Sequence, residues 1–167
     1  MDTADLLTGA LGNLRALVPG IVEGLDEATL TTRPGGSGNP VAWLVWHLAR
    51  VQDDHLADAF DREQVWLADG WQQRFALDLP ADDTGYGHSD AQVAAVRASA
   101  DLLAGYHAAV ADRTEELLAG TTPEQLDRVV DTRWDPPVTL GVRLLSVVTH
   151  TLEHAGQAAY ARGLLGA

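Results

Sequence analysis

The chain has 167 residues, a length that fits one domain with a core of its own. It contains no cysteine, which excludes disulfides, thiolate metal ligands and a cysteine nucleophile. Its formal charge of −13 repels phosphate backbones, so no nucleic-acid partner is expected. Charge interrupts the apolar residues throughout and the chain starts with acidic residues, so we expect neither a membrane span nor a secretory signal, and therefore a cytoplasmic protein.

The first half of the chain predicts two long helices. Apolar residues recur at three- and four-residue spacing over 5–25, which predicts a helix that buries one face, with a kink or break at Pro19. Glycine, proline and threonine at 31–38 indicate a loop. Asn39 then supplies an N-cap followed by proline, which predicts a second helix over 40–60.

The middle of the chain is less regular before a third helix begins. Residues 64–88 set aromatic side chains among Gly, Pro and Asp, which indicates a short helical turn and a long loop. Loops of that length in compact domains are often functional. Ser89 is predicted to cap a third helix that runs to Leu118 and is stopped by Gly120.

A fourth helix is predicted at the end of the chain. Residues 123–126 are expected to form one turn, and 127–137, with a double proline, a connector without a strand. Thr139 caps the fourth helix, which ends at Arg162 or Gly163 in the usual way for a glycine stop.

These elements predict an all-α fold. Four amphipathic helices, with a long crossover between the second and the third, bury their apolar stripes best as a four-helix bundle. Residues 1–167 are therefore expected to form a single four-helix bundle domain.

Three histidines carry the strongest chemical signal. His150 and His154 lie at i and i+4 on the predicted fourth helix, so both imidazoles lie on one face, one turn apart. Such a pair alone does not establish a metal site, because paired histidines also occur on solvated faces. His47 lies at the edge of the apolar stripe of the second helix, and facing side chains in bundle cores often build metal sites. We therefore take His47, His150 and His154 as candidate metal ligands.

Two motifs resemble the DinB/YfiT-like superfamily of metal-binding four-helix bundles. They are W-H-L-A-R at 46–50, and H-T-L-E-H-A-G-Q at 150–157 followed by Y-A-R-G at 160–163. The resemblance covers nearly the whole chain, including the helix order and the long crossover. It implies a metal triad of His47 with the histidine pair at 150 and 154, and zinc or nickel as the metal.

The resemblance also implies an activity. The superfamily includes mycothiol-dependent S-transferases and the metal-binding domain of mycothiol-dependent maleylpyruvate isomerase. The isomerases have glutamate where His150 stands, so the resemblance favours a transferase that uses a mycothiol-type thiol on an electrophilic small molecule. Three nitrogen ligands leave a coordination position open for water or substrate. A metal-dependent hydrolase that uses a metal-bound water, and a non-enzymatic metal- or ligand-binding bundle, remain alternatives. Homodimers are common in the superfamily, which makes a homodimer the expected assembly.

Several polar residues are secondary candidates. Glu153 and Gln157 lie one turn from the histidine pair, so each is either a partner that orients an imidazole or a solvent-facing residue. Asp54 is either a carboxylate near the metal or, more often, a surface acid. Arg162 is expected to cap the fourth helix through its dipole, with binding of an anion as the other interpretation.

Five tryptophans and three further histidines complete the candidates. Each tryptophan is expected to pack in the core, and several together are candidates for the wall of a pocket over the metal. His55 is expected to be a core histidine, and no role is assigned to His88 or His107 because neither has a partner at a useful spacing. The tryptophans are Trp43, Trp46, Trp66, Trp71 and Trp134.

Overall fold

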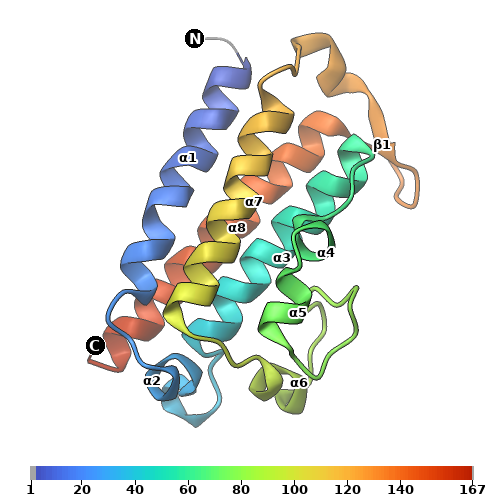
Figure 1. The fold of residues 1–167 in the computed structure, drawn as a ribbon. Helices are drawn as coiled ribbons and strands as arrows, with labels where there is room; N and C mark the ends of the chain where they lie inside the picture. The colour runs from blue at the N-terminus through green and yellow to red at the C-terminus, as the bar shows by residue number, and fades with distance from the viewer. Residues whose placement is uncertain (1–2, 167) are drawn as a thin grey trace.

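Four long helices form the body of the structure, a computed structural model that describes residues 3–166. They are α1 (Thr3–Val22), α3 (Val41–Phe60), α7 (Ala100–Leu118) and α8 (Leu140–Leu164). Helices α1 and α8 run in one direction and α3 and α7 in the other (Figure 1). Both α1 and α3 pack against α7 and α8, so α1 and α3 lie at opposite corners of the bundle. The predicted all-α four-helix bundle is confirmed.

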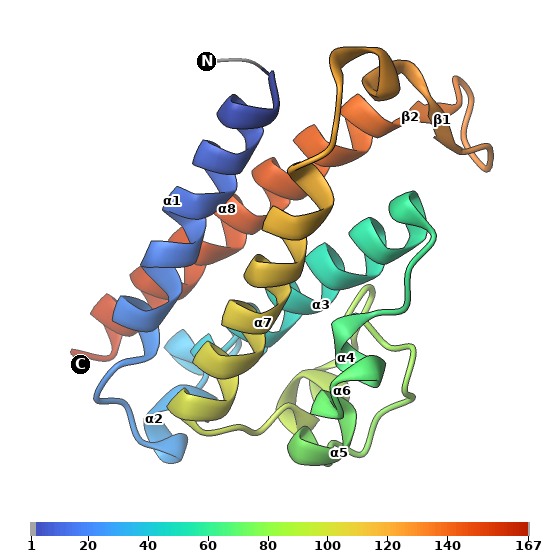
Figure 2. The same cartoon turned by 45° about the horizontal axis from the view of Figure 1, so that its top comes forward.

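Short elements connect the four helices. α2 (Glu27–Thr31) and the 3₁₀ turn η1 (Pro34–Gly36) join α1 to α3. The crossover from α3 to α7 contains α4 (Val65–Ala68), α5 (Trp71–Phe75) and α6 (Asp90–Ala95), grouped at one end of the bundle beside α3 and α7 (Figure 2). A second 3₁₀ turn, η2 (Pro123–Asp127), follows α7 at the position predicted for a single turn.

The third helix is not continuous, so the prediction of one helix from Ser89 to Leu118 is wrong. Ser89 does form a capping box with Gln92, but α6 ends at the extended residue Val96. Ser99 then caps α7, with its hydroxyl oxygen accepting from the amide of Leu102. The segment between the two helices is extended and places Val96 in the core. The helix is interrupted here because Ser99 starts a new helix as its N-cap.

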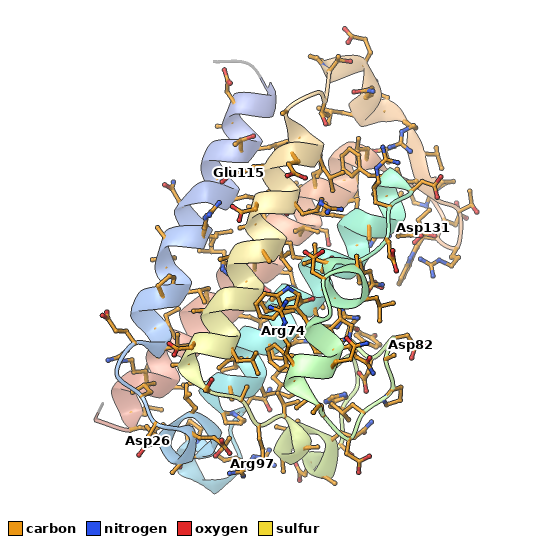
Figure 3. All side chains as sticks on the ribbon, in the orientation of Figure 1. Asp26, Arg74, Asp82, Arg97, Glu115 and Asp131 are labelled. Atoms are coloured by element: carbon orange, nitrogen blue, oxygen red, sulfur yellow. The ribbon has the colours of Figure 1, made fainter. Side chains whose placement is uncertain are left out.

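The connector after η2 contains two strands, which corrects the expectation that it has none. β1 (Val129–Asp131) pairs antiparallel with β2 (Val138–Thr139) in a small hairpin. Pairing satisfies backbone groups of the connector where it passes over the bundle end. Figure 3 labels Asp131 on this hairpin, and charged residues such as Arg97 and Glu115 lie on the outside of the molecule.

Other helix boundaries also differ from the prediction: α8 ends at Leu164, with Leu165 as its C-cap, rather than at Arg162 or Gly163. α1 continues through Pro19 and ends at Val22, three residues before the predicted end. α3 begins at Val41, with Pro40 in the capping position, so Asn39 is not the cap that the sequence predicts. The carbonyl oxygen of Pro40 accepts the first helical hydrogen bond, from Leu44.

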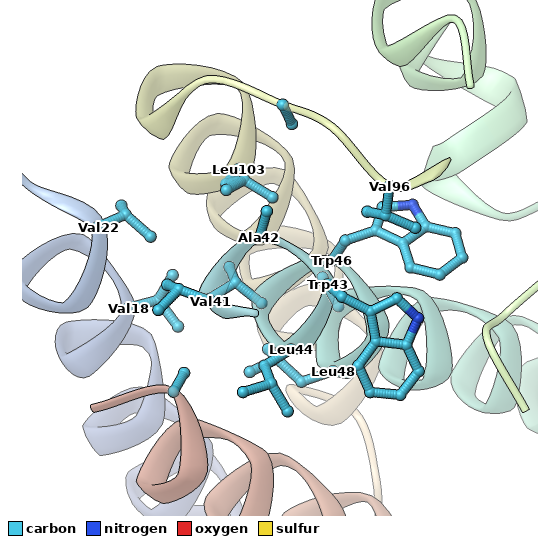
Figure 4. Packing of buried hydrophobic residues seen from close by; sticks show 14 of the residues in the cluster. Val18, Val22, Val41, Ala42, Trp43, Leu44, Trp46, Leu48, Val96 and Leu103 are labelled. Atoms are coloured by element: carbon cyan, nitrogen blue, oxygen red, sulfur yellow. The ribbon is translucent and has the colours of Figure 1, made fainter. Parts of the chain in front are cut away.

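The core is centred on α3. Sixteen residues of this 20-residue helix are buried, so its polar side chains also lie inside the protein. Val18 and Val22 of α1 pack on one side of α3, and Trp43 and Trp46 project on the other (Figure 4). Within the part of the chain that the structure describes, no helix is both long and apolar enough to cross a membrane.

Candidate metal centre

Three imidazoles meet between α3 and α8. His47 is buried, whereas His150 and His154 are half-buried. The ring centroids lie 4.4 to 4.9 Å apart, and one nitrogen from each ring lies within 4.8 Å of the others. The fold thus brings the three histidines of the two helices together in one cluster. We call His47, His150 and His154 the histidine cluster.

The shortest hydrogen-bond distance within the cluster joins one ring nitrogen of His47 to one of His150. Nε2 of His47 lies 3.2 Å from Nε2 of His150. Two nitrogens bound to one tetrahedral zinc ion at about 2.0–2.1 Å lie roughly 3.3 Å apart. Two neutral imidazoles whose lone pairs face each other at this distance repel, so either a proton or a cation has to lie between them. The donor set and its spacing therefore fit a divalent metal ion.

The backbone of the crossover loop sets the tautomer of His47. Its Nδ1 lies 2.5 Å from the carbonyl oxygen of Thr84, so Nδ1–H donates and Nε2 is left with a free lone pair. The ring of Trp43 stacks on the imidazole, with centroids 4.5 Å apart. A carbonyl that accepts from the outer nitrogen is a usual partner of a metal-binding histidine.

Gly85 allows this loop to approach His47. Its φ of +91° is a conformation that side chains rarely adopt, and a Cβ atom there would lie 2.7 Å from Nδ1 of His47. The same atom would lie 3.0 Å from the ring of Trp46. Glycine at 85 is therefore required for the contact between Thr84 and His47. The sequence analysis missed both loop residues, and the only available signal was the G-Y-G turn motif within a long loop.

The two histidines of α8 differ in their outer contacts. Nδ1 of His154 lies 2.9 Å from Oε1 of Gln157, so Nδ1–H donates to the amide oxygen. Nε2 of His154 then keeps its lone pair. Gln157 thus occupies the orienting position proposed for it. Nδ1 of His150 is buried and has no hydrogen-bond partner among the described residues. Glu153 is exposed.

Burial keeps two of the three imidazoles neutral. Desolvation lowers the pKa of His47 to about 4, although its bond to Thr84 opposes the shift. Desolvation, with a smaller effect of the neighbouring His154, lowers the pKa of His150 to about 3. A metal ion binds the neutral form of imidazole, so at pH 7 these ligands need not lose a proton first.

A second histidine fixes the loop that carries Thr84. His88, to which the sequence analysis assigns no role, accepts through Nδ1 from the indole N–H of Trp43 at 3.0 Å. Its Nε2 lies 2.9 Å from both carboxylate oxygens of Asp83. The buried Arg50 donates to the backbone carbonyl of Asp83 at 3.1 Å. The loop is therefore anchored to α3 on both sides of the residue that contacts His47.

The remaining candidates lie outside the cluster. Asp54 contacts His55 and Gln64 rather than a metal ligand, as expected for a surface acid. His55 is partly exposed and is not the core histidine that the sequence predicts, because it lies at the edge of the packed surface of α3. Arg162 donates to the carbonyl oxygens of Gly20 and Ile21, so it caps α1 rather than the helix that carries it.

The aromatic residues divide between core and surface. Trp46 and Trp66 are buried with Tyr106, and Trp71 packs against the same cluster. Trp134 lies on the hairpin and is 66% exposed. Among the tryptophans, Trp43 makes ring contacts with the histidine cluster: it stacks on His47 and meets His154 edge-on.

Comparison with known proteins assigns the family. Residues 6–167 match the model of the mycothiol-S-transferase family. The chain belongs to this family. The crystal structure of a conserved protein from Enterococcus faecalis is similar to this chain, with 34% sequence identity and a TM-score of 0.88. The match covers 99% of this chain and 98% of that one. No curated protein matches the chain significantly.

Family membership indicates the class of activity. The mycothiol-S-transferase family relates the chain to S-transferases that use mycothiol, and so to small-molecule substrates. The histidine cluster provides three nitrogens that could hold a metal ion. The fold expected from the DinB/YfiT-like resemblance is confirmed by this family match and by the Enterococcus structure.

Proposed function

We propose that the protein is a metal-dependent S-transferase that joins a mycothiol-type thiol to an electrophilic small molecule. The observation that supports this proposal is the convergence of three histidine nitrogens in a member of the mycothiol-S-transferase family. Within residues 3–166 the ligand group consists of three side chains. Catalytic zinc sites keep three protein ligands and an open position, whereas structural sites are normally closed by four.

The residues present fit the roles that such a reaction needs. A zinc or nickel ion held by His47, His150 and His154 would supply Lewis acidity that favours the ionised form of a thiol at neutral pH. Thr84 and Gln157 orient two of the imidazoles through their outer nitrogens. The stacked ring of Trp43 covers one face of His47 and excludes water from that side.

The thiol has to come from a co-substrate, because the chain has no cysteine. In the proposed transfer the thiol loses its proton to solvent, and its sulfur forms a bond to the electrophilic carbon. The leaving group departs with its bonding electron pair. Binding both reactants at one site supplies proximity, which lowers the barrier of a bimolecular step.

The test combines metal content with activity. The protein is purified without a metal-affinity tag, dialysed, and analysed for zinc and nickel; transfer from mycothiol to 1-chloro-2,4-dinitrobenzene is then followed for metal-loaded and chelator-treated samples. We expect about one metal ion per chain. The metal-loaded protein should react faster than the spontaneous reaction, and the chelator should remove this enhancement. A protein that neither retains nor takes up zinc or nickel contradicts the proposal. Ester hydrolysis without any thiol, combined with no thiol transfer, would instead establish the hydrolase alternative.

A further inference from the structure

A cleft of about 500 Å³ lies beside the histidine cluster. Its wall includes Ser146, one helical turn before His150 and so about 6 Å away along α8. Its wall also includes Tyr86, which directly follows Gly85, the residue packed against His47. The cleft and the histidine cluster are therefore built on the same segments, and one ligand can extend from the cluster into the cleft.

The cleft holds an ion-pair group in which Asp131 and Arg143 are buried and Arg133 is exposed. Asp131 is 5% exposed and accepts from the backbone N–H, Nε and one Nη of Arg133, all at 2.9 Å. Arg143, 8% exposed, donates through Nη2 to the same carboxylate at 2.8 Å. A guanidinium carries five N–H donors in a rigid plane. Each arginine therefore has N–H groups beyond those that Asp131 uses, held in place at the cleft.

The charge of the cleft does not favour an anion. Asp131 lies between the two guanidinium groups, and Asp58 approaches Arg133 to 3.9 Å. The two positive charges thus face two carboxylates, in a protein whose formal charge is −13. The cleft offers oriented N–H donors at near-neutral local charge. Such a site suits the hydroxyl and carbonyl oxygens of an uncharged ligand.

Two aromatic rings lie at the rim. Tyr86 is 94% exposed and Trp134 is 66% exposed, and both line the cleft. Exposed aromatic rings of this kind present an apolar face next to a polar tip. The C–H faces of a sugar ring pack on such rings while its hydroxyls reach N–H donors below. Aromatic rim and guanidinium floor together form a surface for a polyhydroxylated ring compound.

We propose that this cleft binds the sugar-bearing part of the thiol co-substrate, with its rings against Trp134 and Tyr86 and its hydroxyls on Arg133 and Arg143. The inference rests on the proposed transferase function, because the family thiol, mycothiol, joins a cysteine through an amide to glucosaminyl-inositol. The cysteine end reaches the histidine cluster, and the two rings fill the cleft. The cleft thereby selects this thiol over small thiols that lack the sugar.

Binding of a sulfur-free probe tests the cleft directly. The probe is N-acetylglucosaminyl-inositol, in which an acetyl group replaces the cysteine-bearing acyl group of mycothiol, and binding is measured by calorimetry on metal-loaded and metal-free protein. We expect similar affinity with and without metal, weakened about tenfold or more in Trp134→Ala and in Tyr86→Ala. Leu152→Ala, an exposed apolar residue of α8 outside the cleft, is the matched control and should leave binding unchanged.

The result separates the cleft from the transferase proposal. In cobalt-substituted protein, a thiolate-to-metal charge-transfer band on addition of N-acetylcysteine reports thiol binding at the histidine cluster alone. A cobalt–thiolate band without probe binding overturns the cleft assignment and leaves the proposed function standing. Probe binding that both aromatic variants retain at full affinity also overturns it. Probe binding that the variants weaken, with no cobalt–thiolate band, supports the cleft but contradicts the proposed function.

Discussion

Two polar clusters lie on the buried helix α3, less than two turns apart, and their contacts differ. The carboxylate cluster consists of Arg50, Asp53 and Tyr106. Asp53 accepts from two backbone amides of α4 and, at 2.8 Å, from the hydroxyl of Tyr106, while Arg50 lies 3.7 Å away. In the histidine cluster, by contrast, the inward nitrogens of His47 and His150 face only each other.

This difference separates a structural cluster from a site. Groups of the protein satisfy the carboxylate of Asp53, so this cluster joins α3 to the crossover and α7. The histidine cluster has outer nitrogens held by Thr84 and Gln157, but Nε2 of His47 and Nε2 of His150 face each other at 3.2 Å, and the buried Nδ1 of His150 has no partner within the described residues. Buried polar atoms are nearly always paired in folded proteins. Either a proton on Nε2 of His150 or a bound cation satisfies the pair of inner nitrogens, and metal binding by the histidine cluster is what the following experiments test.

Removal of a histidine is expected to have the largest effect on metal content. His154→Ala should lose its zinc on dialysis, because two remaining ligands rarely hold a divalent ion, while its stability without metal changes by only about 1 kcal/mol. Elemental analysis and urea unfolding measure the two quantities. Glu153→Ala, its exposed neighbour on α8, is the matched control and should keep about one metal ion per chain. Equal zinc retention in both variants would place the metal elsewhere.

The carboxylate cluster should show the opposite behaviour. Asp53→Ala removes the acceptor of three hydrogen bonds and leaves Arg50 buried without its counter-charge, so we expect a loss of about 3–5 kcal/mol in urea unfolding. Asp58→Ala, an exposed acid on the same helix, should stay within about 0.5 kcal/mol of wild type. If Asp53→Ala does not fold, Asp53→Asn serves in its place. The folded fraction should still bind metal. A variant that is stable but binds no metal would show that metal binding depends on the carboxylate cluster as well.

Gly85 provides a test of the outer contact of His47. Gly85→Ala places a Cβ 2.7 Å from the imidazole nitrogen, so the loop has to move and the bond from His47 to Thr84 is lost. Loss of such an outer partner typically costs about 10–100-fold in metal affinity. Gly87→Ala is the matched control: it has the same kind of positive φ, +71°, but nothing within 4 Å of the added atom. Competition with a zinc chelator measures both, and equal affinities would remove Thr84 from the site.

Gln157 should have a smaller effect than Gly85. Gln157→Ala removes the acceptor for Nδ1 of His154, and because this residue is exposed, water can replace it in part. We expect about a tenfold loss of zinc affinity, at the low end for an outer partner. Gln157→Glu keeps the acceptor oxygen and should restore the affinity. If the glutamate variant binds as weakly as alanine, the hydrogen bond does not orient the imidazole.

The sequence predicts the fold further than it predicts the site. Helix periodicity and caps give the four long helices, because each buries one face against the same core. The break before Ser99 and the hairpin at 129–139 were not predictable, since tertiary burial of Val96 and strand pairing decide them. The histidine cluster follows from its spacing on two facing helices. The outer contact from Thr84 does not, because the sequence does not say where a long loop returns to the bundle.

The pH dependence of stability should show the smallest effect. Burial lowers the pKa of His107, on α7 outside both clusters, to about 4, and burial also lowers the pKa of His47 and His150. The unfolded chain takes up protons on these groups near pH 6.5, before the folded protein does. Metal-free protein should therefore lose stability as the pH falls from about 6.5 to 3, because the lowest of these folded-state pKa values, that of His150, is about 3.

His107 isolates one part of this loss. His107→Gln removes a histidine whose pKa is lowered mainly by desolvation, so the variant should lose less stability than wild type between pH 7 and pH 5. Urea unfolding of both metal-free proteins at the two pH values gives the difference. With bound zinc, the contribution of the histidine cluster should grow, because protons then compete with the metal for the same nitrogens. An identical pH response of variant and wild type would mean that His107 titrates normally in the folded protein, and that burial alone does not keep a histidine of this bundle neutral.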